Sequence, residues 1–98
     1  MRIEILEQAA EDLIDGFHFF EEREKGLGAY FLSNLYADIE SLHFYAGIHR
    51  RVYKKYHRLL SKRFTFAVFY TVEGDVAFVH AVVDCRKNPA WIRKHLGV

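Results

Sequence analysis

The sequence has 98 residues, which is enough for one domain (residues 1–98) with a single core. Its residues are 51% hydrophobic and 16% aromatic, and this composition excludes a disordered tail. The one cysteine excludes an intramolecular disulfide framework and favours a reducing compartment. No apolar run reaches the length of a membrane span, and the N-terminus carries acids where a signal peptide would be apolar, so we expect a soluble, cytoplasmic protein without membrane contact.

The formal net charge of +1 conceals a division of charge along the chain. Acids predominate up to Glu24, whereas the stretch 49–63 and the tail 86–98 contain several bases and no acid. This asymmetry indicates a surface for a polyanion or an acidic partner, although two solvated faces would give the same counts.

The N-terminal half predicts a strand over Met1 to Leu6 followed by two helices. From Glu7 to about Arg23, apolar residues recur at spacings of three and four, which is typical of an amphipathic helix. The segment 24–28 breaks the pattern, and a second helix follows up to Gly47, with a core stripe of Phe31, Leu32, Leu35, Ile39, Leu42 and Ala46. So short a link predicts an antiparallel helical hairpin.

The C-terminal half predicts a three-stranded antiparallel meander. A strand over Tyr53 to Leu60 leads into a β-hairpin that turns at 73–75 and ends at Arg86. We expect one face of the first hairpin strand to carry Phe64, Phe66, Val68, Tyr70 and Val72, and one face of the second to carry Ala77, Val79, Ala81 and Val83. Neither face is clearly polar, which indicates that both are at least partly covered.

A short last helix is predicted after Asn88, a good N-cap that is followed by Pro89. We expect Trp91 to pack this helix onto the sheet, although it could instead stack on a base or insert into a target protein. Cys85 should be a small core residue of the preceding strand. The whole chain is thus expected to be an α+β domain, with a helical pair on one face of a small, mainly antiparallel sheet.

Three segments, 56–70, the turn 73–75 and 81–89, resemble the RelE/ParE family of toxins from bacterial type II toxin–antitoxin systems, a family that includes plasmid stabilisation proteins. The order of elements agrees over essentially the whole chain. Thr65 departs from the family, because many relatives carry proline there. The resemblance implies a growth-inhibiting protein that a cognate antitoxin holds inactive.

The resemblance also implies two possible mechanisms, between which the fold alone does not decide. RelE-like members cleave messenger RNA in the ribosomal A site, whereas ParE-like members bind and poison DNA gyrase. A third possibility is an inactive scaffold that only binds an antitoxin.

For the nuclease mechanism, Arg86 matches the arginine at the end of the last strand in RelE-like members, and Arg63 is similar to a second phosphate-binding arginine. These enzymes place a tyrosine or histidine acid/base a few residues further on, but the segment 88–92 has no proton-transfer group here. His95 or His57 would have to supply it, and His80 is a further candidate from the sheet.

We therefore favour the gyrase-binding mechanism over the ribosome-dependent nuclease. Its target-binding surface would be the basic edge and the last helix, with Arg58, Lys62, Arg63, Arg86, Lys87, Trp91, Arg93 and Lys94. The six histidines show no metal-ligand spacing and no glycine-rich phosphate loop is present, so neither a metal nor another cofactor is expected.

Overall fold

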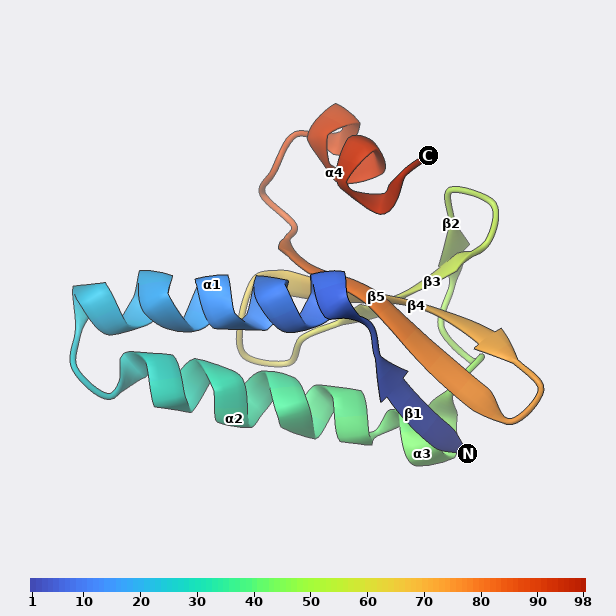
Figure 1. Ribbon diagram of the computed structural model, residues 1–98, viewed down its shortest axis with the longest axis horizontal. Coiled ribbons are helices and arrows are strands. Elements are labelled where there is room, and N and C mark those ends of the chain that lie inside the picture. The colour runs from blue at the N-terminus through green and yellow to red at the C-terminus, as the bar shows by residue number, and fades with distance from the viewer.

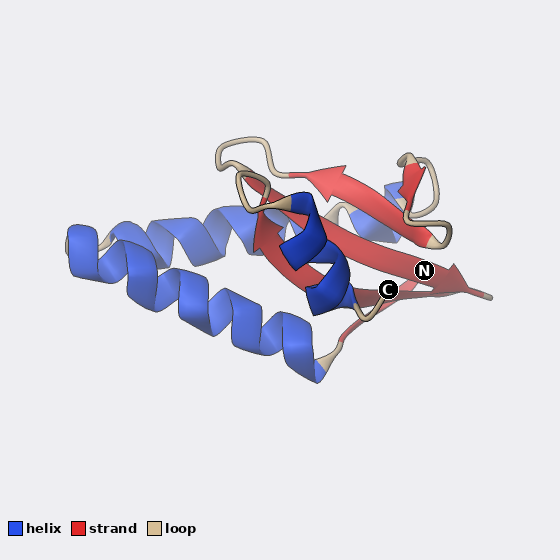
Figure 2. Ribbon diagram, turned by 90° about the horizontal axis from the view of Figure 1, so that it is seen from above, coloured by secondary structure: helices blue, strands red, loops and turns tan.

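The computed structural model describes residues 1–98 and contains a five-stranded sheet with helices on both faces (Figures 1 and 2). The elements in chain order are β1 (Arg2–Ile5), α1 (Glu7–Arg23), α2 (Leu27–Glu40), α3 (Leu42–Tyr45), β2 (Arg51–Val52), β3 (Tyr56–Leu60), β4 (Phe66–Glu73), β5 (Val76–Asp84) and α4 (Pro89–Leu96). The strand order is β1-β5-β4-β3-β2, with β1 parallel to β5 and the other neighbours antiparallel. The predicted α+β architecture is confirmed.

The helices α1 and α2 form the predicted antiparallel hairpin on one face of the sheet (Figure 1). Two glycines allow the helices to approach closely. A Cβ added at Gly16 would lie 2.5 Å from the ring of Phe31, and one added at Gly28 would lie 2.6 Å from the carbonyl oxygen of Phe17. Gly16 lowers the intrinsic stability of α1 by roughly 1 kcal/mol relative to alanine, and the packing of a fully buried Phe31 requires it.

The other face of the sheet is covered by α4, so both faces are indeed buried (Figure 2). The Asn88 side chain accepts a hydrogen bond from the backbone N–H of Ala90, which confirms the predicted N-cap. From α4, Ile92 and Leu96 pack against the sheet, and the hydroxyl of Tyr56 donates to the carbonyl of Leu96 at 3.0 Å.

The predicted side-chain alternation is correct for β4 and wrong for the end of β5. Phe66, Val68 and Tyr70 face the helical hairpin as expected. In β5, Ala77 and Val79 share that face. Ala81 and Val83, however, pack on the opposite face with α4, and Val82 faces the hairpin instead. The cause is a β-bulge: Phe69 pairs with Ala81 and Tyr70 with Val79, so His80 is an extra residue that reverses the alternation.

Two predicted elements are each divided in the structure. The second helix ends at Glu40 and a separate turn of helix follows, because the Ser41 hydroxyl donates to the Asp38 carbonyl and competes with the regular backbone ladder. The predicted strand over Tyr53 to Leu60 begins only at Tyr56, and a short partner strand, β2, precedes it. The sheet therefore has an outer β2–β3 hairpin that the sequence did not indicate.

The segment that leads into β2 is fastened to the core by Tyr70, which is fully buried. Its hydroxyl accepts a hydrogen bond from the Gly47 N–H at 3.0 Å and lies 2.5 Å from Nδ1 of His49. The ring of His57 stacks on the ring of Tyr70, with 5.0 Å between the two ring centroids. Burial, and then the charge of His57, lowers the pKa of His49.

This lowered pKa predicts that the protein becomes less stable in mild acid. The folded state resists protonation of His49, while the unfolded chain takes up the proton near pH 6.5, so the free energy of unfolding should fall as the pH drops through and below that value. Burial also lowers the pKa of His80, so this residue contributes to the same loss of stability in acid. Urea denaturation at a series of pH values measures the effect. The His49→Gln variant should show a shallower pH dependence, and an unchanged dependence in this variant would contradict the assignment.

Candidate functional site

The predicted basic residues at the two ends of the hairpin lie at one end of the sheet. Phe66 at the start of β4 pairs with Asp84 at the end of β5, and the Cys85 N–H donates to the Thr65 carbonyl at 2.7 Å. The two segments that leave the sheet there hold exposed cations, namely Lys62, Arg63, Arg86 and Lys87. We call this set the basic edge. Arg58 is exposed on β3, the strand that leads to it.

Arg86 is not free to form an open phosphate clamp. Its Nη2 lies 2.7 Å from Oδ2 of Asp84, and its Nε donates to both carboxylate oxygens at 3.1 and 3.2 Å. The hydrogen bond from Arg86 holds the pKa of Asp84 below its usual value. The arginine side chain is 68% exposed, so an incoming anion can reach it but must compete with this carboxylate.

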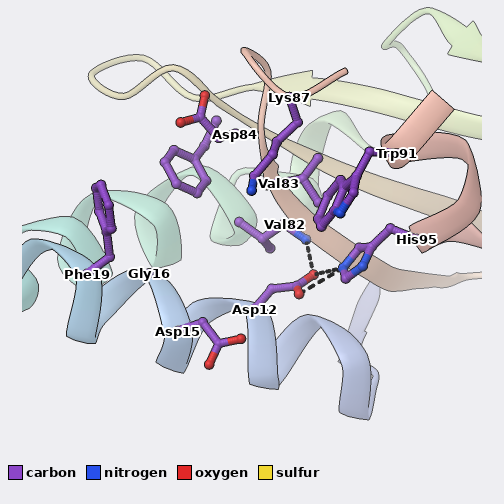
Figure 3. Close-up of a pocket in the computed structure, with 11 residues that line it drawn as sticks. Asp12, Asp15, Gly16, Phe19, Val82, Val83, Asp84, Lys87, Trp91 and His95 are labelled. Atoms are coloured by element: carbon purple, nitrogen blue, oxygen red, sulfur yellow. Dashed lines mark hydrogen bonds and ion pairs between the residues drawn. The ribbon is translucent and has the colours of Figure 1, made fainter. Parts of the chain in front are cut away.

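A pocket of about 320 Å³ lies between α1, the sheet and α4 beside the basic edge (Figure 3). Its floor is apolar, its α1 wall carries carboxylates, and its α4 side carries Lys87 and aromatic rings. We call it the α1–α4 groove. It is lined by Asp12, Asp15, Gly16, Phe19, Phe66, Val82, Val83, Asp84, Lys87, Trp91 and His95.

The α1–α4 groove is closed at one end by a contact between Asp12 and His95 (Figure 3). The Nε2 of His95 lies 2.9 Å from Oδ1 of Asp12, and the backbone N–H of Val82 donates to Oδ2 at 2.9 Å. The side chains are only 19% and 10% exposed, and burial raises the pKa of Asp12. His95 therefore ties α4 to α1 and to β5, and its Nε2 is occupied by a structural partner.

The structure corrects two sequence predictions near the groove. Trp91 does not complete the core: it is 42% exposed, while Ile92 and Leu96 are the buried residues of α4. The Trp91 ring stacks on His95 at 4.6 Å, and Nζ of Lys87 lies 4.7 Å above it. Cys85 is exposed in the turn after β5 and is not a core residue of the strand, because the last paired residue is Asp84.

The four residues named for nuclease chemistry do not converge on one centre. Arg63 and Arg86 belong to the basic edge, whereas His95 lines the α1–α4 groove. His57 lies on β3, where it lines a different pocket and Nδ1 is 2.8 Å from the carbonyl oxygen of His49. No group of three or more His, Cys, Asp or Glu side chains could hold a metal ion. No helix combines the length and apolar character needed to cross a membrane.

Asp12 is the residue of this site that sequence reasoning missed. The amphipathic pattern of the first helix predicts that Asp12 lies away from the apolar stripe, as Glu11 and Asp15 do. A signal was present, because Asp12 precedes buried Leu13 directly and follows buried Ala9 by three residues, which places it at the edge of the buried face.

Comparison with solved structures finds this fold in a chain of the chromosomal ParDE TA (toxin–antitoxin) system from P. aeruginosa. The TM-score is 0.79, and the match covers 86% of this chain and 95% of that chain at 14% sequence identity. The two chains share a fold. The resemblance to RelE/ParE toxins is thereby confirmed for the architecture. No family model and no curated protein matches the sequence.

Proposed function

We propose that this protein is the toxin of a type II toxin–antitoxin module and that it inhibits growth by binding and poisoning DNA gyrase. The shared fold with a chain of a ParDE TA system, over nearly all of both chains, supports the toxin assignment. The cognate antitoxin would be the partner that keeps the protein inactive.

The partners that already hold the candidate side chains favour target binding over RNA cleavage. Cleavage of RNA through its own 2′-hydroxyl needs a base, an acid and cations around one phosphate. Here Arg86 pairs with Asp84, and His95 is held by Asp12. His57 lines a pocket that includes neither arginine of the basic edge. A binding mechanism needs only an exposed surface, which the basic edge and α4 offer.

The proposed target-binding surface combines the basic edge with the outward face of α4. Because Ile92 and Leu96 face the sheet, α4 presents Arg93 and Lys94 to solvent together with the partly exposed Trp91. Tryptophan and arginine are the residues that most often dominate binding energy at protein interfaces. Arg58 extends the same cationic surface along β3.

The α1–α4 groove is our proposed antitoxin site. Its apolar floor suits an antitoxin segment that folds on binding, and an acidic part of that segment would cover the neighbouring basic edge. Such an arrangement would block the target-binding surface directly.

Two assays on the purified, antitoxin-free protein test this proposal. In a supercoiling assay with purified gyrase and relaxed plasmid, we expect loss of supercoiling and accumulation of cleaved DNA. In a translating extract, primer extension on a reporter messenger should show no cuts. Ribosome-dependent cuts within codons would instead establish the nuclease mechanism. A folded protein that is inert in both assays would indicate an inactive antitoxin-binding scaffold.

A further inference from the structure

A second pocket, of about 370 Å³, lies at the other end of the β4–β5 hairpin from the basic edge. It is polar where the α1–α4 groove is largely apolar, and neither the target-binding surface nor the antitoxin site uses it. Its lining residues come from four strands and one turn and are Arg51, Lys55, His57, Thr71, Val72, Glu73 and His80. We call it the β3 pocket.

Two backbone irregularities create the β3 pocket. The pairing of β3 with β4 ends at His57 and Tyr70, so the last part of β4 has no neighbour on the β3 side. The chain turns away there through Tyr53 and Lys54, which have positive φ angles of 50° and 74°. Side chains of this kind rarely adopt such angles, and each costs of order 1 kcal/mol or more. The turn brings Lys55 into the lining of the pocket.

The second irregularity is the β-bulge in β5. The extra residue at the bulge is His80, and its Nε2 lies 2.9 Å from the Thr71 hydroxyl across the strand pair. Bulges often redirect a side chain next to a functional site. A strained turn and a bulge therefore meet at one small pocket, and each brings a nitrogen-bearing side chain to it.

The polar groups of the β3 pocket are mostly hydrogen-bond donors. Arg51 and Lys55 are cationic, Thr71 has a hydroxyl, and Glu73 is the one carboxylate. Nδ1 of His57 must carry its hydrogen, since its partner is a carbonyl oxygen, and this leaves Nε2 to accept or hold a second proton.

We propose that the β3 pocket binds a phosphate group. The guanidinium of Arg51 and the ammonium group of Lys55 supply several charged N–H donors, and the Thr71 hydroxyl can add one more. Such donors suit the oxygens of a tetrahedral anion. The phosphate can belong to a small molecule, either inorganic phosphate or a nucleotide, or to the backbone of an RNA strand. This inference does not depend on the gyrase assignment, since no residue of the β3 pocket belongs to the target-binding surface.

The test is a titration of the full-length protein with three probes: inorganic phosphate, AMP and a short single-stranded RNA. Calorimetry measures affinity, and the imidazole NMR signals of His57 and His80 report where each probe binds. We expect these signals to shift. We also expect Arg51→Gln and Lys55→Gln each to weaken binding about tenfold or more, as for loss of a charged hydrogen bond. The matched control is Lys25→Gln, an exposed lysine in the α1–α2 link that should not alter binding.

The three probes distinguish the sources of the phosphate group. Binding of phosphate or AMP would identify a small-molecule site, whereas binding of RNA alone, with the same loss in the pocket variants, would identify a backbone phosphate. The proposal is overturned if none of the probes shifts the two histidine signals, or if Lys25→Gln weakens binding as much as the pocket variants do. Gyrase inhibition by Lys55→Gln, measured in parallel, should equal that of the unmodified protein, so failure of one proposal leaves the other testable.

Discussion

A protein carrying Trp91→Ala, Arg93→Ala and Lys94→Ala together is expected to lose growth inhibition while it stays folded. The three side chains are exposed on α4, whereas Ile92 and Leu96, which hold the helix on the sheet, are retained. Truncating a tryptophan or arginine at the centre of an interface often costs about 2 kcal/mol or more. The combined loss should thus weaken target binding by at least about 100-fold.

Growth of cells that express each variant from an inducible promoter measures this effect, with circular dichroism and thermal unfolding as checks on the fold. Arg86→Ala is the informative comparison. Under the gyrase mechanism it should cost less than the triple variant, but under the nuclease mechanism it should abolish toxicity. Glu11→Ala with Glu22→Ala, on the exposed side of α1, is the control for changes of surface charge. Full toxicity of the triple variant would remove α4 from the target-binding surface.

The sequence correctly predicted the features that depend only on residues close to one another in the chain. The period of apolar residues in α1, the cap at Asn88 and the alternation in β4 each depend on neighbours in sequence, and all three are confirmed. The reversal at His80 could not be predicted, because a bulge depends on how two strands register with each other. β2 was missed since two residues are too short for a periodic signal.

The candidate site was predictable only in outline. The basic edge follows from hairpin topology, which places both ends of a hairpin together, and the sequence was sufficient for that. The Asp12–His95 contact depends on side-chain geometry between two elements that are 83 residues apart in sequence. The Asp84–Arg86 pair depends on the conformation of the turn that follows β5. For the same reason the exposed position of Trp91 was not foreseen: either Trp91 or Ile92 could face the sheet, and the rotation of α4 about its axis decides between them.

Replacing Asp12 by alanine is expected to lower the free energy of unfolding by about 1–3 kcal/mol. The substitution leaves the Val82 N–H without its acceptor, and it leaves His95 with the Gln8 side chain in place of a carboxylate partner. Asp12→Asn should cost less, because an amide oxygen can still accept from Val82 and carries no buried charge. Asp15→Ala is the control, since this acid lines the same groove and is exposed.

A double-mutant cycle that combines Asp12→Ala with His95→Ala tests whether the two side chains stabilise the protein through their mutual contact or independently. If the contact ties α4 to α1, the two substitutions together should cost less than the sum of the single ones, with a coupling of about 0.5–3 kcal/mol. Urea denaturation measures all four proteins. The same tether positions the proposed target-binding face of α4. Under the gyrase mechanism, Asp12→Ala should therefore also weaken gyrase inhibition, whereas Asp15→Ala should not. Strictly additive losses with full inhibition would mean that the hydrophobic contacts of Ile92 and Leu96 suffice to place α4, and that Asp12 and His95 stabilise the fold independently of each other.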